Sequence, residues 1–359
     1  MNSKMSYPEP LIKVLSPQEQ KDASKFSEDV CKKIAAVAGV NIVFQGQRTA
    51  GEELLKNLDR RGHTYEQYIS YLNLVNRQAY YRPEAKVAIL IANEKYEHLS
   101  KLVTPSIDCE ALGNSIRELD FITVFISNTK SDMLKEILMK TFSLIPENSY
   151  CFIFYAGHGC ELITTKCILS IDCPSENIEF DHCVTENWLL RELAKCKPEL
   201  CVLIMDMCRV NLDRQTNQEI YRAIPHIEEY TIHSNLLISY STQSANAAYE
   251  CIWVEKSETI GDTSYSVKST DVVCGGGSQY VNALWSRLCE NDVDISTMLD
   301  NVHGDVENSV KHQRPIKVQC GVSKRYLSDS VEGNTKELWS TLKGALEKYQ
   351  EYCSVCLEK

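Results

Sequence analysis

The hydrophobic pattern divides the chain into a helical part and a part in which strands and helices alternate. Over the first eighty residues, apolar positions recur every three or four residues, the period of an amphipathic helix. A capping box at Ser16–Glu19 predicts a first helix that continues through the apolar positions of Phe26–Ala38. A second helix is expected over 51–61, and Thr64–Gln67 caps a third. Tyr80–Pro83 interrupts the pattern and predicts a boundary.

After Lys86 the period changes. Short, nearly continuous apolar runs alternate with helical patterns, which is typical of a mostly parallel sheet with helices on both faces. The expected strands are Val87–Ala92, Phe121–Ile126, Tyr150–Tyr155, Cys201–Met205, Asn235–Tyr240 and Ile316–Gly321. Helices are expected over Asp108–Leu119, Ser131–Phe142 and Thr185–Ala194. The predicted fold class is therefore α/β, a mostly parallel six-stranded sheet preceded by a small all-α region.

Two segments of the second half lack the strand pattern. Lys256–Gly277 is polar and ends in three glycines, so it is expected to form a loop. Asn334 caps an amphipathic helix near the end of the sequence. The predicted organisation is a helical region over 1–79, a linker over 80–85, an α/β domain over 86–330 and a C-terminal amphipathic helix over 331–359.

Composition narrows the classes of function. Thirty-eight basic and 49 acidic residues give a net charge of −11 over 359 residues, which argues against a nucleic-acid partner. No apolar run approaches the roughly 20 residues that span a bilayer, and no signal peptide is visible, so no membrane partner is expected. Sixteen cysteines at irregular spacings indicate reduced thiols in a cytoplasmic or nuclear protein. Cys353 and Cys356 have no second pair, so we expect no metal and no cofactor.

Reactive side chains follow two of the expected strands. His158 comes directly after the third strand and Cys208 directly after the fourth. Because ligands bind beyond the carboxyl ends of strands in such sheets, an imidazole and a thiol here can meet at hydrogen-bond distance. The imidazole can then accept the thiol proton and later protonate a leaving amine. The backbone N–H groups of Gly159 and Cys208 are the candidates for an oxyanion hole.

Three segments carry a family resemblance. They are Lys86-Val-Ala-Ile-Leu-Ile-Ala-Asn93, Tyr155-Ala-Gly-His-Gly159 and Met205-Asp-Met-Cys-Arg209. The region from about Lys86 to Ser330 resembles the paracaspases, which are caspase-related cysteine proteases. The resemblance implies a caspase-hemoglobinase fold, cleavage after arginine, and a place in intracellular immune or NF-κB-type signalling. It also implies that Cys208 is the nucleophile and His158 the general base and acid.

The resemblance further implies an acidic pocket for the substrate residue P1, lined by Asp108, Asp206 and Glu250. Asp206 and Cys208 are two positions apart at a strand end, so their side chains point to one side. A carboxylate 4 Å from a guanidinium gains ~4 kcal/mol at an effective dielectric of 20, before desolvation. We expect arginine to be preferred and lysine to be weaker, because only arginine offers a planar fork. The alternatives are a helix N-terminal carboxylate for Asp108 and a solvated loop residue for Glu250.

Partners follow partly from the pattern and partly from the resemblance. We expect protein substrates with a basic P1 residue to pair as an added strand near Ser239–Thr242. Leu54–Ile69 resembles the later part of a death domain, which implies an adaptor protein as partner, although any pair of capped helices gives a similar pattern. An exposed edge strand at Ile316–Gly321 would support a homodimer. Two other functions stay open: a non-catalytic signalling scaffold, and a calcium-stimulated metacaspase-like protease, for which no EF-hand-like acidic loop is visible.

Overall fold

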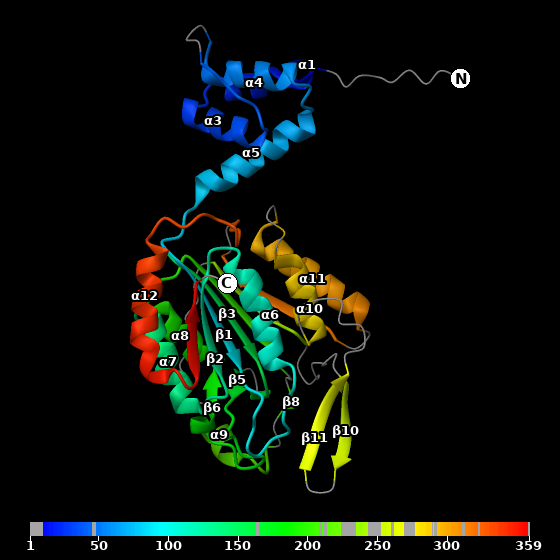
Figure 1. Ribbon diagram of the computed structural model, residues 1–359, viewed down its shortest axis with the longest axis vertical. Helices are drawn as coiled ribbons and strands as arrows, with labels where there is room; N and C mark the ends of the chain where they lie inside the picture. The colour runs from blue at the N-terminus through cyan, green and yellow to red at the C-terminus, as the bar shows by residue number, and fades with distance from the viewer. Residues whose placement is uncertain are drawn as a thin grey trace, which may run out of the picture. The chain divides into compact units, whose positions relative to one another are not determined.

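The computed structural model shows two compact units, Met1–Arg82 and Pro83–Lys359, each described by itself below (Figure 1). The division falls inside the expected linker. The structure describes residues 10–44, 48–162, 165–207, 210–211, 214–223, 235–242, 253–259, 262–268, 277–288, 290, 293–310, 313–321 and 324–357.

The first unit consists of helices around a small apolar core. Its helices are α1 (Leu11–Val14), α2 (Pro17–Ala23), α3 (Glu28–Val37), α4 (Ala50–Arg60) and α5 (Tyr65–Tyr80). Both predicted capping boxes are present, and a third joins Thr49 to Glu52 at the start of α4. Each box satisfies backbone N–H groups that have no partner within the helix. The core is formed by buried side chains from all five helices, among them Leu11, Ala23, Ile34, Leu54 and Tyr68.

The first predicted helix is two helices, which corrects the expectation of one continuous element. The turn after Ala23 separates α2 from α3. Ser27 begins α3 as its N-cap, and its hydroxyl accepts a hydrogen bond from the N–H of Val30. A serine at this position favours a cap over a helix interior because its side chain competes for backbone hydrogen bonds. The apolar period alone does not show this break.

The second unit is built on a seven-stranded sheet in the order β12-β9-β7-β3-β1-β2-β13. The inner strands β9, β7, β3, β1 and β2 pair in parallel, while β12 and β13 pair antiparallel at the two edges. The strands are β1 (Lys86–Ala92), β2 (Ile122–Ser127), β3 (Tyr150–Ala156), β7 (Leu200–Asp206), β9 (Leu236–Tyr240), β12 (Ile316–Cys320) and β13 (Cys353–Cys356). All six predicted strands are present to within one residue at each end.

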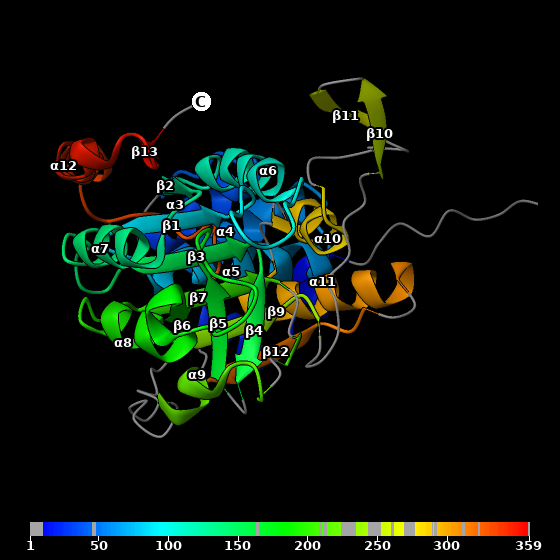
Figure 2. The same cartoon turned by 90° about the horizontal axis from the view of Figure 1, so that it is seen from below.

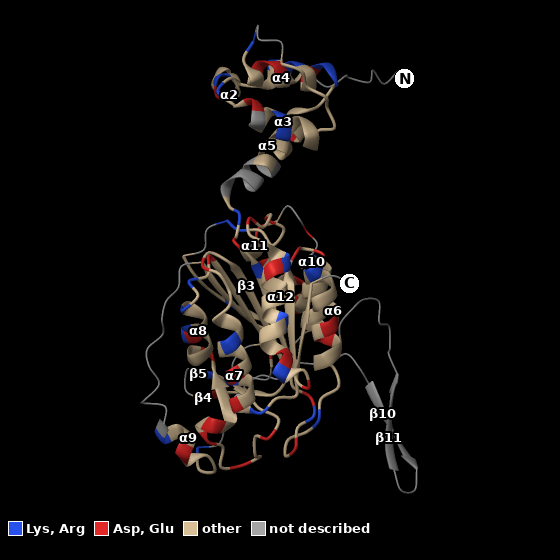
Figure 3. Ribbon diagram, turned by 60° about the vertical axis from the view of Figure 1, so that its left-hand side comes forward, with Lys and Arg blue, Asp and Glu red and all other residues tan. Residues whose placement is uncertain are grey.

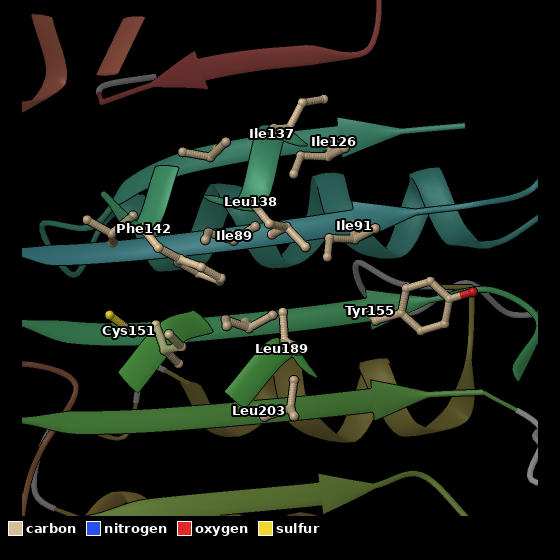
Figure 4. Close-up of a cluster of buried hydrophobic side chains, with 14 of the residues drawn as sticks. Ile89, Ile91, Ile126, Ile137, Leu138, Phe142, Cys151, Tyr155, Leu189 and Leu203 are labelled. Carbon is tan, nitrogen blue, oxygen red and sulfur yellow. The ribbon is translucent and has the colours of Figure 1, made fainter. Parts of the chain in front are cut away.

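Helices cover both faces of this sheet, which is why β1, β3 and β7 are buried at every position and are almost entirely apolar (Figure 2). One face packs against α7 (Ser131–Phe142), α8 (Glu186–Ala194) and α12 (Thr335–Leu346). Figure 4 shows this core, where Ile89 and Ile91 of β1 lie between Leu138 of α7 and Leu189 of α8. The other face carries α6 (Pro105–Arg117), α10 (Gln279–Leu288) and α11 (Ile295–Ser309). Charged residues occur mostly on helices and loops (Figure 3).

A smaller sheet continues from the carboxyl ends of β3 and β7. Its strands are β6 (Cys183–Thr185), β5 (Thr165–Leu169), β4 (Gly159–Leu162) and β8 (Val210–Asn211), in that order. The remaining short helices are η1 (Phe180–His182), α9 (Gln218–Ala223) and η3 (Glu347–Tyr349). Because β4 begins one residue after His158, this sheet fixes the chain directly beyond the end of β3.

Two predictions for the second unit need correction. The segment over 331–359 is more than an amphipathic helix, because β13 follows α12 and adds a seventh strand beside β2. The expected Ile316–Gly321 strand is therefore at an edge of the sheet but is not the last strand of the chain. The expected Lys256–Gly277 loop overlaps an antiparallel hairpin of β10 (Trp253–Thr259) and β11 (Asp262–Lys268), so its first part is strand. No helix among the described residues is long and apolar enough to cross a membrane.

Candidate active site

The chain keeps one register on both sides of His158. Ala156 at the end of β3 lies opposite Asp206 at the end of β7, and the N–H of Gly157 donates to the carbonyl of Asp206 at 3.4 Å. Further on, Cys160 in β4 lies opposite Val210 in β8. The differences 206 − 156 and 210 − 160 are both 50, so the described pairs before and after His158 share one offset in the sequence. Cys208 itself lies outside the described residues.

His158 is held from three directions. Its backbone N–H donates to the hydroxyl of Tyr96 at 2.7 Å, and its carbonyl accepts from the hydroxyl of Tyr155 at 2.6 Å. The imidazole packs against the Tyr96 ring, with 4.5 Å between ring centroids and 52° between planes. Both tyrosines are fully buried, so they form a rigid support for a half-buried imidazole.

The hydrogen bond of the imidazole defines its tautomer. Nε2 lies 2.7 Å from the carbonyl oxygen of Ser100 and 3.2 Å from the hydroxyl of the same residue. A carbonyl oxygen only accepts, so Nε2 carries a proton and donates it to this bond. In the neutral ring, Nδ1 is then the nitrogen that can take up a proton. This tautomer of the neutral ring is the one in which Nδ1 can act as a general base.

Gly157 and Gly159 flank the histidine because larger residues do not fit. A Cβ atom on Gly159 would lie 2.1 Å from Sδ of Met207, the last described residue before Cys208. A Cβ atom on Gly157 would lie 2.4 Å from the Tyr155 hydroxyl, at a φ of 157°. The glycines thus allow Met207 and Tyr155 to pack tightly against the turn that carries His158.

The predicted acidic residues Asp108 and Asp206 lie together, although they come from α6 and from the end of β7. Asp108 is 1% exposed and Asp206 is 7% exposed. Burial, and then the charge of Asp206, raise the pKa of Asp108 to about 8, while the N–H groups of Ser278 and Gly277 lower it by less. A raised pKa of this kind is typical of two carboxyl groups that share one site. Glu250 lies outside the described residues.

Asp108 lies in the first turn of α6, as the alternative prediction of a helix N-terminal carboxylate has it, and it also bonds to the chain just before α10. The helix α6 begins at Pro105, three residues earlier than expected, and Asp108 lies within its first turns. Its Oδ1 accepts from the backbone N–H groups of Gly277 and Ser278, at 2.5 and 3.0 Å, two residues that directly precede α10. The hydroxyl of Thr104, the residue before α6, also interacts with this carboxyl group and lowers its pKa. By hydrogen-bond geometry, the buried Oδ2 has no donor among the described residues.

The predicted substrate edge at Ser239–Thr242 is wrong where it includes Ser239 and Tyr240. Both residues lie in β9, which pairs with β7 on one side and β12 on the other, so they offer no open edge. The Ser239 hydroxyl is buried and bonded to Tyr280, at 2.5 Å, and to Nε2 of His303, at 2.7 Å. Burial lowers the pKa of His303 to about 4, so this imidazole is neutral at physiological pH.

Sequence reasoning missed four residues that surround the predicted site. They are Tyr96 and Ser100, which hold the imidazole, Ser278, which contacts both aspartates, and Glu94, whose carboxylate accepts from the N–H of Ser106 in the first turn of α6. A serine just before a helical pattern is a recognisable N-cap, so the position of Ser278 was accessible from sequence. Its contact with Asp108, 170 positions earlier in the chain, was not.

Comparison with known proteins places this arrangement in a family. Residues 85–327 match the caspase domain. The chain belongs to the caspase-domain family. It is 25% identical over 251 residues to the human "Mucosa-associated lymphoid tissue lymphoma translocation protein 1", and 25% identical over 251 residues to the mouse homologue. These matches confirm the paracaspase resemblance that the motifs predict. They include 69% of this chain but 27% of the length of either relative.

A solved structure is also similar. Caspase-1 from Spodoptera frugiperda aligns with a TM-score of 0.48 at 14% identity, over 70% of this chain and 93% of that chain. The family region ends at residue 327, so α12 and β13 lie outside it.

Proposed function

We propose that this protein is a cysteine endopeptidase that cleaves protein chains after arginine, and after lysine less efficiently, through Cys208 and His158. The observation that carries the proposal is the common offset of 50 positions before and after His158. The same offset leads from His158 to position 208, which bears the only cysteine between Cys201 and Cys251. The tautomer fixed by Ser100 supports the role of the imidazole as a base.

The reaction follows from these groups. Nδ1 of His158 accepts the thiol proton, and the Cys208 sulfur attacks the scissile carbonyl carbon. The oxygen that becomes negative is stabilised by the N–H groups of Gly159 and Cys208, and one such donor contributes ~3 kcal/mol. The C–N bond breaks as the imidazolium gives its proton to the leaving amine, which leaves a thioester on Cys208. Water, deprotonated by His158, hydrolyses the thioester and restores the thiol.

Asp108 and Asp206, the acidic pair, would supply the specificity for P1. We propose that Asp108, Asp206 and Glu250 bind the guanidinium of a P1 arginine. Two buried carboxyl groups at the end of β7 repel an acidic side chain, and Oδ2 of Asp108 has no donor of its own among the described residues. Arginine presents five N–H donors in a plane, whereas lysine presents a single charged group, so arginine gains more from this site.

The experiment is a series of fluorogenic peptides that differ only at P1. Wild-type protein is expected to cleave the arginine peptide fastest, the lysine peptide more slowly and the aspartate peptide least. Cys208→Ala is the control, and it should cleave none of them. If the aspartate peptide is cleaved faster than its arginine counterpart, the pocket assignment is wrong.

Assembly and partners form a separate part of the proposal. The edge strand β12 pairs only with β9 among the described strands, and Val318 at its centre is 41% exposed. Unpaired backbone groups on such an edge suit a second copy of the chain, so we propose a homodimer through Ile316–Gly321. We also propose that the helices of the first unit, as a death-domain-like module, bind an adaptor in intracellular immune signalling.

A further inference from the structure

Ser278 contacts both members of the acidic pair at once. It lies one residue before α10 and is 5% exposed. Its backbone N–H donates to Oδ1 of Asp108 at 3.0 Å, and its hydroxyl donates to Oδ2 of Asp206 at 2.5 Å. Asp108 and Asp206, which are 98 positions apart in the sequence, thus both bond to the same serine.

The direction of the Ser278 hydroxyl proton is fixed by a third contact. The N–H of Val281, in the first turn of α10, donates to Oγ of Ser278 at 3.0 Å. A hydroxyl has one proton and two lone pairs. One lone pair of Oγ accepts from Val281. The Asp206 carboxylate on the other side can only accept, so the Ser278 hydroxyl proton points to Asp206. Ser278 is therefore an N-cap whose free hydroxyl proton serves the acidic pair.

We propose that Ser278 is a positioning residue for arginine recognition, which fixes the carboxylates of Asp108 and Asp206 in the orientation that binds a P1 guanidinium. This inference rests on the proposed function. Two adjacent carboxylates repel each other, and each hydrogen bond to the ionised form offsets part of that cost. The N-terminus of α10, ten residues long, adds a positive partial charge at the same place.

The carboxyl oxygens that bond to the protein differ from the oxygen that we expect to bind the substrate. Ser278 and Gly277 take Oδ1 of Asp108, and Ser278 takes Oδ2 of Asp206, so these oxygens are held by the protein. Oδ2 of Asp108 is left for the substrate among the described contacts. A guanidinium that enters then meets a carboxyl group whose orientation is already fixed, so less ordering is needed on binding, and its positive charge favours the ionised form of Asp108 over the protonated one. Loss of the Ser278 hydroxyl should weaken binding of arginine more than it slows bond cleavage.

The test compares Ser278→Ala with Ser278→Thr in the full chain, with Ser286→Ala as the matched control. Ser286 lies on the same helix and is exposed, and its hydroxyl donates to the carbonyl of Ala283 in the preceding turn. For an arginine-P1 peptide, Ser278→Ala is expected to raise KM about tenfold or more, the loss that a hydrogen bond to a charged group gives. The value of kcat should change less than twofold. Ser278→Thr keeps the hydroxyl and should restore KM, while Ser286→Ala should match wild type.

A pH profile distinguishes positioning from a merely structural role. Without the donor, the ionised form of the pair is less favoured, so the rise of kcat/KM with pH should move to higher pH in Ser278→Ala. An unchanged KM and an unchanged profile would overturn the inference, as would an equal loss in kcat for every P1 residue. If Ser278→Ala fails to fold by circular dichroism, Ser278→Cys replaces it, because a thiol is a weaker donor of similar shape and should give an intermediate KM.

Failure of the proposed function has a different signature. In that case wild-type protein and Ser286→Ala cleave no arginine peptide, and the inference falls with it. If wild type cleaves the arginine peptide and only the serine variants behave unlike the prediction, the role of Ser278 alone is refuted.

Discussion

Replacing Asp108 with asparagine tests whether two carboxyl groups share the buried site. Asparagine has nearly the same shape, and its carbonyl oxygen can still accept from the N–H groups of Gly277 and Ser278. Only the ionisable group beside Asp206 is removed. The effect on stability should therefore depend on pH in a way that a packing defect would not.

The sign follows from the raised pKa of Asp108. In the unfolded chain the carboxyl ionises near 3.8, whereas in the folded protein it holds its proton until about pH 8. Between these values the folded state binds more protons, so the free energy of unfolding falls as pH rises. The slope is at most about 1.4 kcal/mol per pH unit. Between pH 5 and pH 7 this group is expected to lower the free energy of unfolding of wild type by up to about 3 kcal/mol. Asp108→Asn lacks the ionisable group and should not show this decrease.

Urea unfolding at pH 5 and pH 7 measures this difference. The free energy of unfolding of Asp108→Asn minus that of wild type should be about 1 to 3 kcal/mol more positive at pH 7 than at pH 5. The control is Asp132→Asn, since Asp132 is an exposed aspartate in the first turn of α7. Its stability relative to wild type should not change with pH. A difference between Asp108→Asn and wild type that is the same at both pH values would refute the shared site.

Three further predictions follow from the same geometry. Gly159→Ala places a Cβ atom 2.1 Å from Met207 Sδ and should reduce cleavage of an arginine peptide about a hundredfold, whereas Gly344→Ala, in open space, should leave it unchanged. Val318→Asp on the edge of β12 should shift sedimentation to the monomer; Val43→Asp, exposed in the first unit, is the control, and a persistent dimer would refute the interface. A calcium chelator should leave cleavage unchanged, and a lost activity that calcium restores would favour the metacaspase-like alternative.

The sequence was most informative where a local rule decides the structure. The capping boxes at Ser16 and Thr64 begin helices as predicted, and α7 has the predicted bounds. The inner strands are apolar because both faces of the sheet are covered, so a continuous apolar run identifies them. His158 was recognisable because it directly follows such a run.

What the sequence did not reveal depends on contacts between distant segments. Cys353–Cys356 is a four-residue strand that exists because it pairs with the edge of β2, and its short sequence has no strand pattern of its own. The hairpin of β10 and β11 has a mostly polar sequence. Hydrophobic periodicity predicts only elements with an apolar face, so it did not predict this hairpin. The contact of Ser278 with Asp108 joins α10 to α6, and no local pattern reports it.

The most direct measurement is covalent labelling with a peptide chloromethyl ketone that carries arginine at P1, followed by mass spectrometry of the digested protein. The reagent should alkylate Cys208 alone among the sixteen cysteines, and Cys208→Ala should remain unlabelled. In His158→Ala the rate should fall by about a hundredfold or more, because the imidazole accepts the thiol proton. Labelling of another cysteine, or an equal rate without His158, would contradict a Cys208–His158 protease.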